Sequence, residues 1–404
     1  MSDRLHRPDG KPPRVLTVGG GVAALEAVLA LRALAGKRLE LELIAPDRDL
    51  RYPPLEVVEP FGLTPPTIDL TVALASLEAI HRRETVTVVD PLQRVVQTSS
   101  GALLPYEALV IAVGARALPP VEGALTFGGT AATRELQQLI EDGICGRVEH
   151  ILFALPAGTA WPLPLYELAL LTVHRLRSRG VMTQVAIATP ERVPLELFGG
   201  RASGHVREQL AVAGIAFHGG IHVDRILRSE VAIESGGGRL PADRVVTLPS
   251  LRGPALAGLP HDREGFLPVD RHGAVIGVHD VYAAGDAADH AVKQGGLATQ
   301  QADAIASAIA ARAGAAVTAE PYRGVLRGML LNAGDPTYLE ADREGAGVTT
   351  GGPTPLWWPP AKVAGRYLAP FIGQRLGAPA TAEPDLPPMW RAGSVPCEIA
   401  VGTD

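Results

Sequence analysis

The chain has 404 residues, of which 47% are hydrophobic and 20% charged, and its formal net charge is −6. This length accommodates two or three domains with large cores, and the balance is typical of a soluble globular protein. No lysine/arginine block stands out, so we do not expect the protein to bind nucleic acid. No uncharged apolar run approaches the ~18 residues that span a bilayer, and residues 1–13 lack an apolar signal core, so we expect a cytoplasmic protein.

The first predicted unit is a strand, a glycine turn, a helix and a second strand. The apolar run Val15–Val18 leads directly into the turn Gly19–Ala24, the helix is expected from about Val22 to Ala35, and the second strand covers Leu39–Ala45. A Gly-x-Gly-x-x-Ala turn of this kind lets backbone approach a pyrophosphate at the N-terminus of the helix. The unit therefore predicts a dinucleotide site.

A second unit of the same kind follows. Two β-rich segments, Thr85–Val89 and Arg94–Gln97, precede the apolar run Tyr106–Ala115, where the chain can leave the first domain. From about Pro119 to Leu248 a second α/β unit is expected. Its strands are predicted at His150–Leu155, at Val181–Ala188 and from Gly214, and its helices at Tyr166–Arg177 and Ser203–Ala213.

The strand Val281–Asp286 returns the chain to the first domain and ends on Gly285-Asp286. An aspartate at this place can hold the sugar alcohol that links a pyrophosphate to a flavin, although Asp286 alone could also be a helix N-cap. Together with the glycine turn, this strand predicts an FAD site. Lys293-Gln294-Gly295 then opens a helix from about Gly296 to Ala313, whose N-terminal partial positive charge would stabilise the anion of a reduced flavin.

Four stretches carry a resemblance to a known family: Gly19–Glu26, Tyr106–Ala115, Val281–Asp286 and Lys293–Ala302. They resemble the two-dinucleotide-binding-domain FAD-dependent pyridine nucleotide-disulfide oxidoreductases. Within that superfamily the chain is most similar to the branch of type II NADH dehydrogenases, sulfide:quinone oxidoreductases and flavocytochrome c sulfide dehydrogenase flavoproteins.

The resemblance implies an α/β fold of two Rossmann-like three-layer nucleotide-binding domains and a C-terminal capping or interface region. The expected FAD domain comprises residues 13–118 and 249–325, the NAD(P)-type domain residues 119–248 and the capping region residues 326–404. The residues expected to bind FAD are Gly19, Gly21, Val22, Ala23, Ala24, Asp47, Ala112, Gly114, Gly285, Asp286, Lys293, Gln294 and Gly295. Asp47 is included because Ala45 stands where an acid usually binds the adenosine ribose.

The second nucleotide domain departs from both familiar patterns of the branch. Its turn retains only Gly158 and contains Pro156, Pro162 and Pro164, and proline lacks the N–H that a pyrophosphate needs. This argues against tight binding of NAD(P)H in the familiar manner. Trp161 stands where the sulfide-oxidising members have a cysteine.

The two cysteines of the chain offer no substitute. Cys145 and Cys397 lie elsewhere and form no metal-ligand cluster, so neither the disulfide route of sulfide oxidation nor a metal site is expected.

Three side chains are candidates for catalysis. Glu167 matches a glutamate that the branch places near the flavin and would relay a proton, Lys293 would add charge at the flavin edge, and Trp161 would stack on a reductant. The alternatives are a glutamate stabilised by the helix dipole, a solvated lysine and an ordinary packed tryptophan. Glu191, after the next strand, would bind a nicotinamide ribose or be solvated in its loop.

The C-terminal region contains a short helical pattern, Ala361–Ile372, after Trp357-Trp358. The tryptophans either pack this piece on the FAD domain or help segment 355–372 to contact a membrane peripherally. The predicted function is an FAD-dependent oxidoreductase that passes electrons to a quinone-like or other small acceptor. Its donor stays open, and the alternatives are a sulfide:quinone-oxidoreductase-like protein with a changed donor and a non-catalytic flavin redox partner or sensor.

Overall fold

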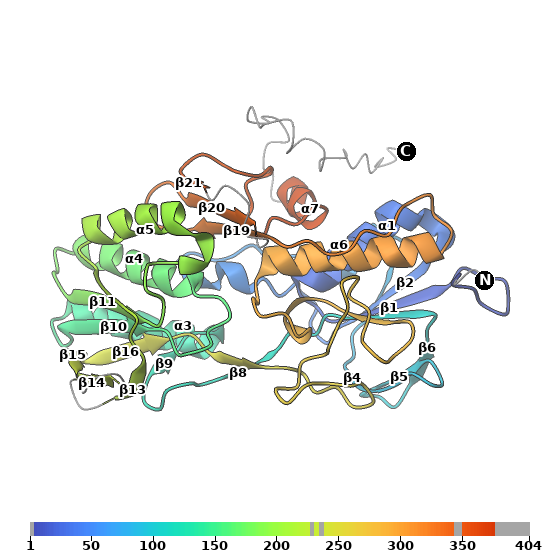
Figure 1. The fold of residues 1–404 in the computed structure, drawn as a ribbon, viewed down its shortest axis with the longest axis horizontal. Helices are drawn as coiled ribbons and strands as arrows, with labels where there is room; N and C mark the ends of the chain where they lie inside the picture. Colours follow the sequence, from blue (N-terminus) through green and yellow to red (C-terminus); the bar gives the residue numbers. More distant parts are fainter. Residues whose placement is uncertain (1–3, 227–229, 234–237, 343–349, 376–404) are drawn as a thin grey trace.

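The computed structural model describes residues 4–226, 230–233, 238–342 and 350–375. Two five-stranded parallel sheets, each covered by helices on one face, lie at opposite ends of an elongated molecule (Figure 1). The expected fold class, two Rossmann-like three-layer domains with a C-terminal region, is confirmed. The domain boundaries given above stay a prediction.

The first sheet has the strand order β18-β7-β1-β2-β3. Its strands are β1 (Arg14–Val18), β2 (Glu40–Ile44), β3 (Ile80–Arg82), β7 (Ala108–Ile111) and β18 (Val281–Ala283). Helices α1 (Val22–Ala35) and α6 (Gly295–Arg312) cover one face, and the antiparallel strands β4 (Val86–Asp90), β5 (Val95–Thr98) and β6 (Leu103–Pro105) cover the other. Short elements complete this half: α2 (Leu70–Ala75) and the 3₁₀ turns η1 (Gly36–Arg38), η2 (Pro53–Phe61) and η4 (Gly285–Ala287).

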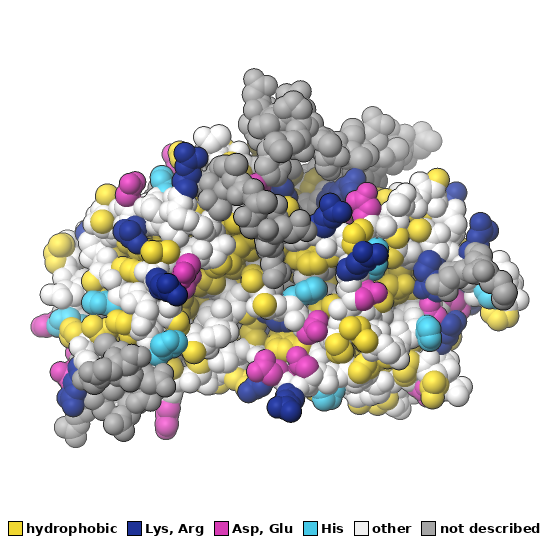
Figure 2. All heavy atoms as spheres, in the orientation of Figure 1, with side chains coloured by type: hydrophobic (Ala, Val, Ile, Leu, Met, Phe, Trp, Pro, Cys, Tyr) yellow, Lys and Arg dark blue, Asp and Glu magenta, His cyan; other side chains and the backbone are white. Residues whose placement is uncertain are grey.

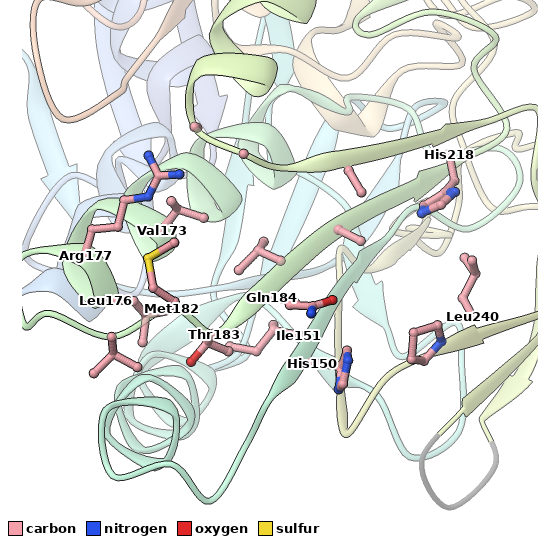
Figure 3. A pocket seen from close by; sticks show the side chains of 17 residues that line it. His150, Ile151, Val173, Leu176, Arg177, Met182, Thr183, Gln184, His218 and Leu240 are labelled. Carbon is pink, nitrogen blue, oxygen red and sulfur yellow. The ribbon is translucent and has the colours of Figure 1, made fainter.

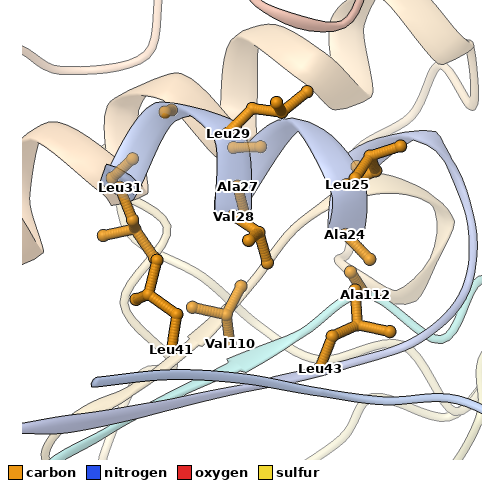
Figure 4. Close-up of a cluster of buried hydrophobic side chains, with 14 of the residues drawn as sticks. Ala24, Leu25, Ala27, Val28, Leu29, Leu31, Leu41, Leu43, Val110 and Ala112 are labelled. Atoms are coloured by element: carbon orange, nitrogen blue, oxygen red, sulfur yellow. The ribbon is translucent and has the colours of Figure 1, made fainter. Parts of the chain in front are cut away.

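Helix α1 lies close on the sheet because its inward side chains are small or apolar. Figure 4 shows Ala24, Ala27 and Val28 facing Leu43 and Val110 of the strands below. All of these side chains are fully buried, and each fully buried valine or leucine stabilises the fold by roughly 1.5–3 kcal/mol. The helix therefore holds the glycine turn against the carboxyl edge of the sheet.

The second sheet has the order β12-β11-β10-β16-β9. Its strands are β9 (Leu125–Thr126), β10 (His150–Ala154), β11 (Gln184–Thr189), β12 (Ala216–Gly219) and β16 (Arg244–Thr247). Helices α3 (Gly129–Ile144), α4 (Leu163–Arg177) and α5 (Gly200–Val212) pack on one face, and β13 (Val223–Ile226), β14 (Glu230–Ile233) and β15 (Arg239–Pro241) on the other. The 3₁₀ turn η3 (Glu196–Phe198) precedes α5.

The two domains are joined by a pair of antiparallel strands. In β8 (Arg116–Leu118) the chain leaves the first domain, and in β17 (Ser250–Arg252) it returns, with Ala117 opposite Leu251. Charged side chains of both signs are interspersed over the face that Figure 2 shows. This agrees with the absence of a basic block in the sequence.

The C-terminal region is an antiparallel sheet, β19 (Val325–Leu330), β20 (Thr337–Asp342) and β21 (Thr350–Gly352), followed by helix α7 (Leu368–Arg375). The prediction of a helix from Ala361 is wrong, because α7 begins only at Leu368. The preceding backbone donates to tertiary partners instead: Val363 N–H bonds the Tyr52 hydroxyl at 3.1 Å. Pro370 is tolerated because it lies in the first turn of α7.

The apolar side chains of segment 355–372 face inward. Val363, Leu368 and Phe371 belong to the same apolar core as helix α1, and Trp357 packs edge-on against Tyr338 with 5.1 Å between ring centroids. This favours the packing alternative, since membrane contact through these side chains would require the segment to leave the core. No helix among the described residues has the length and apolar character needed to cross a membrane.

The C-terminal sheet docks tightly on the second domain at Gly328. A Cβ at this position would lie 2.7 Å from Phe198 Cζ and 2.8 Å from Leu163 Cδ1. Phe198 is fully buried and cannot swing away. We expect Gly328→Ala to lower the free energy of unfolding by about 1–3 kcal/mol through overpacking.

A denaturant titration measures this loss, with Gly334→Ala as the control. A Cβ at Gly334 meets nothing nearer than 3.7 Å, so that variant should match the wild type. Equal stability of all three proteins would contradict the docking.

Candidate functional site

The glycine turn after β1 is built as a pyrophosphate turn requires. Gly19 has a φ of +132°, and a Cβ there would lie 2.1 Å from the carbonyl oxygen of Ala112, at the end of β7. Gly21, the N-cap residue of α1, has open space in front of it: a Cβ would meet no heavy atom within 4 Å. The first turn of α1 has neither a side-chain cap nor an acidic residue, so its N–H groups are available to an anion.

The return strand closes on the same turn. Ala284 N–H bonds the carbonyl of Ile111 at 3.0 Å, and Gly285 N–H bonds Gln301 Oε1 at 2.7 Å. A Cβ on Gly285 would lie 3.4 Å from the Cβ atoms of both Ala23 and Ala298. The two distant stretches therefore meet at the N-terminus of α1, as predicted.

Asp286 carries a carboxyl without a hydrogen-bond partner among the described residues, although its side chain is partly buried. Burial raises the pKa of this carboxyl, and the nearby Lys293 opposes the rise. A partly buried acid without a partner, beside the glycine turn, is suited to bind a ligand hydroxyl.

Gln294 is the N-cap of helix α6, and its side-chain oxygen accepts from Leu297 N–H at 2.8 Å. Gly295 follows in close contact with two other segments: a Cβ would lie 2.9 Å from Val363 and 3.6 Å from Pro54. The N-terminus of α6 thus meets η2 and the C-terminal region. This is where the flavin edge was predicted.

Lys293 lies beside this helix start, and its ammonium group has protein partners. The Nζ atom donates to the carbonyl of Ala288 and stands 3.8 Å above the centre of the Phe266 ring. Burial lowers the pKa of Lys293 to about 8. The solvated-lysine alternative is therefore wrong.

The expected ribose end of the site has no acid directly after β2. Ala45 stands where an acid is usual, and its side chain is buried. A Cβ on Gly20 would lie 3.2 Å from the Cβ atom of Ala45. Asp47 is exposed two residues later and has no hydrogen-bond partner among the described residues. Gly114, after β7, has a φ of +74° and open space around it.

Glu167 forms a buried ion pair that the sequence reasoning missed. Its Oε1 accepts from the Nζ of Lys362 and from Leu331 N–H at 2.7 Å, while Lys362 also donates to the carbonyl of Met329 at 2.5 Å. Glu167 is fully buried, and its Oε2 has no partner among the described residues. Burial raises the pKa of Glu167 and lowers that of Lys362, and each charge opposes the shift of the other.

Trp161 packs edge-on against Phe198, with 5.8 Å between the ring centroids. The helix that follows begins with Pro162 as N-cap and has Pro164 in its first turn, so α4 offers a phosphate few N–H donors. Helix α4 starts three residues before its predicted first residue, Tyr166.

Glu191 is satisfied within the protein. It accepts from the Tyr166 hydroxyl at 2.7 Å and from Glu196 N–H at 3.0 Å. Burial raises the pKa of its carboxyl. The two contacts through which NAD(P)H usually binds are thus changed. Prolines alter the N-terminus of α4, and Glu191 is already bonded within the protein.

Hollows among the described residues of the second domain include the following pair. One, of about 270 Å³, is at the amino edge of the sheet, where His150, Gln184 and Met182 surround it (Figure 3). The other, of about 550 Å³, lies between α4, α5 and the turn before β20. The first hollow faces away from the carboxyl edge at which dinucleotides bind.

Cys145 is exposed at the end of α3, and Cys397 lies outside the described residues. Cys145 is not among the residues brought together here.

The chain is similar to known oxidoreductases in sequence and in structure. The family described as pyridine nucleotide-disulphide oxidoreductase matches residues 167–313. An NADH dehydrogenase-like protein of Mycobacterium tuberculosis is 29% identical over 303 residues, which cover 68% of this chain and 72% of the relative. The sulfide-quinone reductase of Aquifex aeolicus is 27% identical over 277 residues, which cover 62% of this chain and 61% of that protein.

The fold agrees with this result. The structure of the Aquifex aeolicus sulfide:quinone oxidoreductase matches with a TM-score of 0.75 at 20% identity, over 84% of this chain and 87% of that chain. The resemblance to the pyridine nucleotide-disulphide oxidoreductases that the sequence motifs indicate is thus confirmed in sequence and in fold. This resemblance supports the flavin-dependent class of oxidoreductase and FAD as the cofactor.

The residues at the glycine turn fit FAD. The open space at Gly21 gives room for the pyrophosphate, and the uncapped N-terminus of α1 supplies N–H donors to it. The carboxyl of Asp286, which has no hydrogen-bond partner among the described residues, can accept from a ligand hydroxyl. The individual binding residues remain a proposal.

Proposed function

We propose that this protein passes electrons through FAD to a quinone-like acceptor and takes them from a small donor other than NAD(P)H bound in the usual manner. The observation that carries the proposal is the meeting of Gly19–Ala24, Gly285-Asp286 and the start of α6 at one place. The corresponding turn of the second domain offers few N–H donors to a phosphate. The relative named a sulfide-quinone reductase supports the class of acceptor.

Bound FAD supplies a two-electron carrier that is reduced by the donor and reoxidised by the acceptor. The chain's own residues do the rest. The N-terminus of α6 would offer partial positive charge to a reduced flavin ring bound beside it. Glu167, raised in pKa and with one oxygen unpartnered, is the proposed proton carrier.

Trp161 is the proposed contact for the donor. It stands half-buried at the turn before α4 and is held by Phe198. An aromatic ring fixed at one edge offers a planar surface for stacking. Its replacement by alanine should raise the KM for the donor more than it lowers kcat.

The absence of an NAD(P)H site of the usual kind makes a direct prediction. We expect a yellow holoprotein whose visible flavin band is unchanged by NADH or NADPH in large anaerobic excess. Pro162 and Pro164 remove N–H donors at α4, and Glu191 is already bonded to Tyr166, so a dinucleotide gains little there. Stepwise anaerobic titration with NADH, NADPH and sulfide, each followed by dithionite, measures this.

Full bleaching by dithionite alone is the control that shows a reducible flavin. Rapid bleaching by NADH would replace this proposal with a second candidate, an NAD(P)H dehydrogenase with a non-standard binding mode. That candidate is favoured by the intact second sheet and by the NADH dehydrogenase-like relative. A colourless protein that cannot be reconstituted with FAD would remove both.

A further inference from the structure

The hollow of about 270 Å³ at the amino edge of the second sheet is here called the amino-edge cavity. Its walls come from the C-terminal ends of α4 and α5, from the first residues of β10, β11 and β12, and from β15. Figure 3 shows Arg177 and Met182 at one side and His218 and Leu240 at the other, with Gln184 between them. Dinucleotides bind at the opposite, carboxyl edge of such a sheet, so a ligand in this cavity would not compete with one.

The floor of the amino-edge cavity is apolar and well packed. Branched apolar side chains that are at most 7% exposed line it: Ile151, Val173, Leu176 and Val185. Met182 also lines the cavity, although it is 78% exposed, and a flexible thioether side chain adapts readily to an apolar ligand. An apolar cavity of about 150 Å³ is large enough for benzene, so this one has room for a ring with a short side chain.

The charge of the cavity wall comes from Arg177, the last residue of α4. Its Nη1 donates to the carbonyl of Val212 at 3.3 Å, at the C-terminal end of α5. Its Nη2 lies against Gly214, where a Cβ would be only 2.8 Å away, and has no hydrogen-bond partner among the described residues. The guanidinium group is therefore held in place by one bond and keeps N–H groups for a ligand.

The lining of the cavity selects for a negative charge. None of the described residues that line it is acidic, although the chain as a whole has a net charge of −6. The two other titratable side chains in the wall are His150 and His218. The ring of His150 is oriented by Asp243, whose Oδ2 lies 3.6 Å from Nδ1 and accepts the backbone N–H of His150 at 2.9 Å. A wall that carries a cation and no anion is complementary to an anionic ligand.

We propose that the amino-edge cavity binds a small carboxylate with an apolar, ring-sized body. The carboxylate would accept charge-assisted hydrogen bonds from Arg177, which are stronger than bonds between neutral groups. The body would lie on Val173 and Leu176 and remove their cavity-facing surface from water. The proposal does not rest on the proposed function, because the wall contains none of the residues expected to bind FAD.

A ligand-observed NMR titration of the FAD-loaded protein with 3-phenylpropionate tests the site. We expect a Kd of about 0.1–1 mM, which is ordinary for a ligand of this size. The neutral isostere 3-phenylpropanamide should bind at least about tenfold more weakly, because it offers Arg177 no charge. Equal affinity for the acid and the amide, or no binding of the acid up to about 5 mM, would overturn the proposal.

Two variants locate the ligand. Arg177→Met should weaken binding of the acid about tenfold or more and leave binding of the amide unchanged. Ala216→Trp should abolish binding of both compounds, because Ala216 lines the cavity from an exposed position and the indole would fill the space. Arg179→Met is the matched control and should bind like the wild type, since Arg179 is exposed two residues further on and does not line the cavity. Unchanged binding of the acid in Arg177→Met would refute the site.

A third variant separates this cavity from the proposed donor site. Trp161→Ala should bind 3-phenylpropionate like the wild type, because Trp161 does not line the cavity. Loss of binding in Trp161→Ala, or competition between the acid and FAD, would place the ligand elsewhere and overturn the proposal. A protein that binds the acid as expected but cannot be loaded with FAD would instead refute the proposed function and leave the cavity standing.

Discussion

Replacing Gly21 with alanine is expected to lower the affinity for FAD about 100-fold, or about 2.7 kcal/mol, while the apoprotein stays as stable as the wild type. The backbone of Gly21 is extended, with φ −104° and ψ −171°, so any residue can adopt it. The new methyl group would enter the open space before α1 and hold the pyrophosphate away from the helix N–H groups. Fluorescence titration with FAD and thermal unfolding of the apoprotein measure the two effects.

Gly19→Ala gives the contrasting result. Its Cβ would lie 2.1 Å from a backbone oxygen of Ala112 at a φ of +132°, so we expect misfolding in place of a clean affinity loss. Gly204→Ala in α5 is the control, since a Cβ there meets nothing within 4 Å. Wild-type FAD affinity in Gly21→Ala would show that the pyrophosphate does not approach this turn.

The local parts of the fold could be predicted because neighbouring residues determine them. Helix α1 has the predicted ends, Val22 and Ala35, since Gly21 and Gly36 flank an uninterrupted run of small and apolar residues. Helix α4 starts earlier than predicted, at Leu163, because proline is tolerated in a first turn. Helix α3 (Gly129–Ile144) was not predicted, although its buried Leu136, Leu139 and Ile140 have helical spacing.

The long-range contacts could not be predicted, because nothing local indicates them. Val363, Tyr367 and Leu368 share a helical stripe with Phe371, yet the first three donate their N–H groups to Tyr52 and Glu26. Tertiary partners more than 300 residues away thus override the local pattern. The one signal for Lys362 was a lysine inside an apolar segment.

Replacing Lys362 with methionine is expected to destabilise the protein by about 3–5 kcal/mol, because it leaves the carboxylate of Glu167 buried without its counter-ion. Glu167 is fully buried and only Leu331 N–H would remain on its Oε1. Loss of the ammonium group would raise the pKa of Glu167 further. When the pKa of an acid is raised in the folded state, the folded protein loses stability as pH rises. The destabilisation caused by Lys362→Met should therefore be smaller at pH 5 than at pH 8.

The double variant Glu167→Gln with Lys362→Met separates charge from packing. It removes both charges and keeps the side-chain lengths, so it should recover most of the stability and lose the pH dependence. Lys37→Met is the control, since Lys37 is 84% exposed in its ion pair with Glu78 and should change stability by no more than about 0.5 kcal/mol. Urea titrations of the four proteins at both pH values measure this. A single Lys362→Met variant as stable as the wild type would mean that Glu167 is neutral in the folded protein, and the proton would then already reside on the proposed carrier.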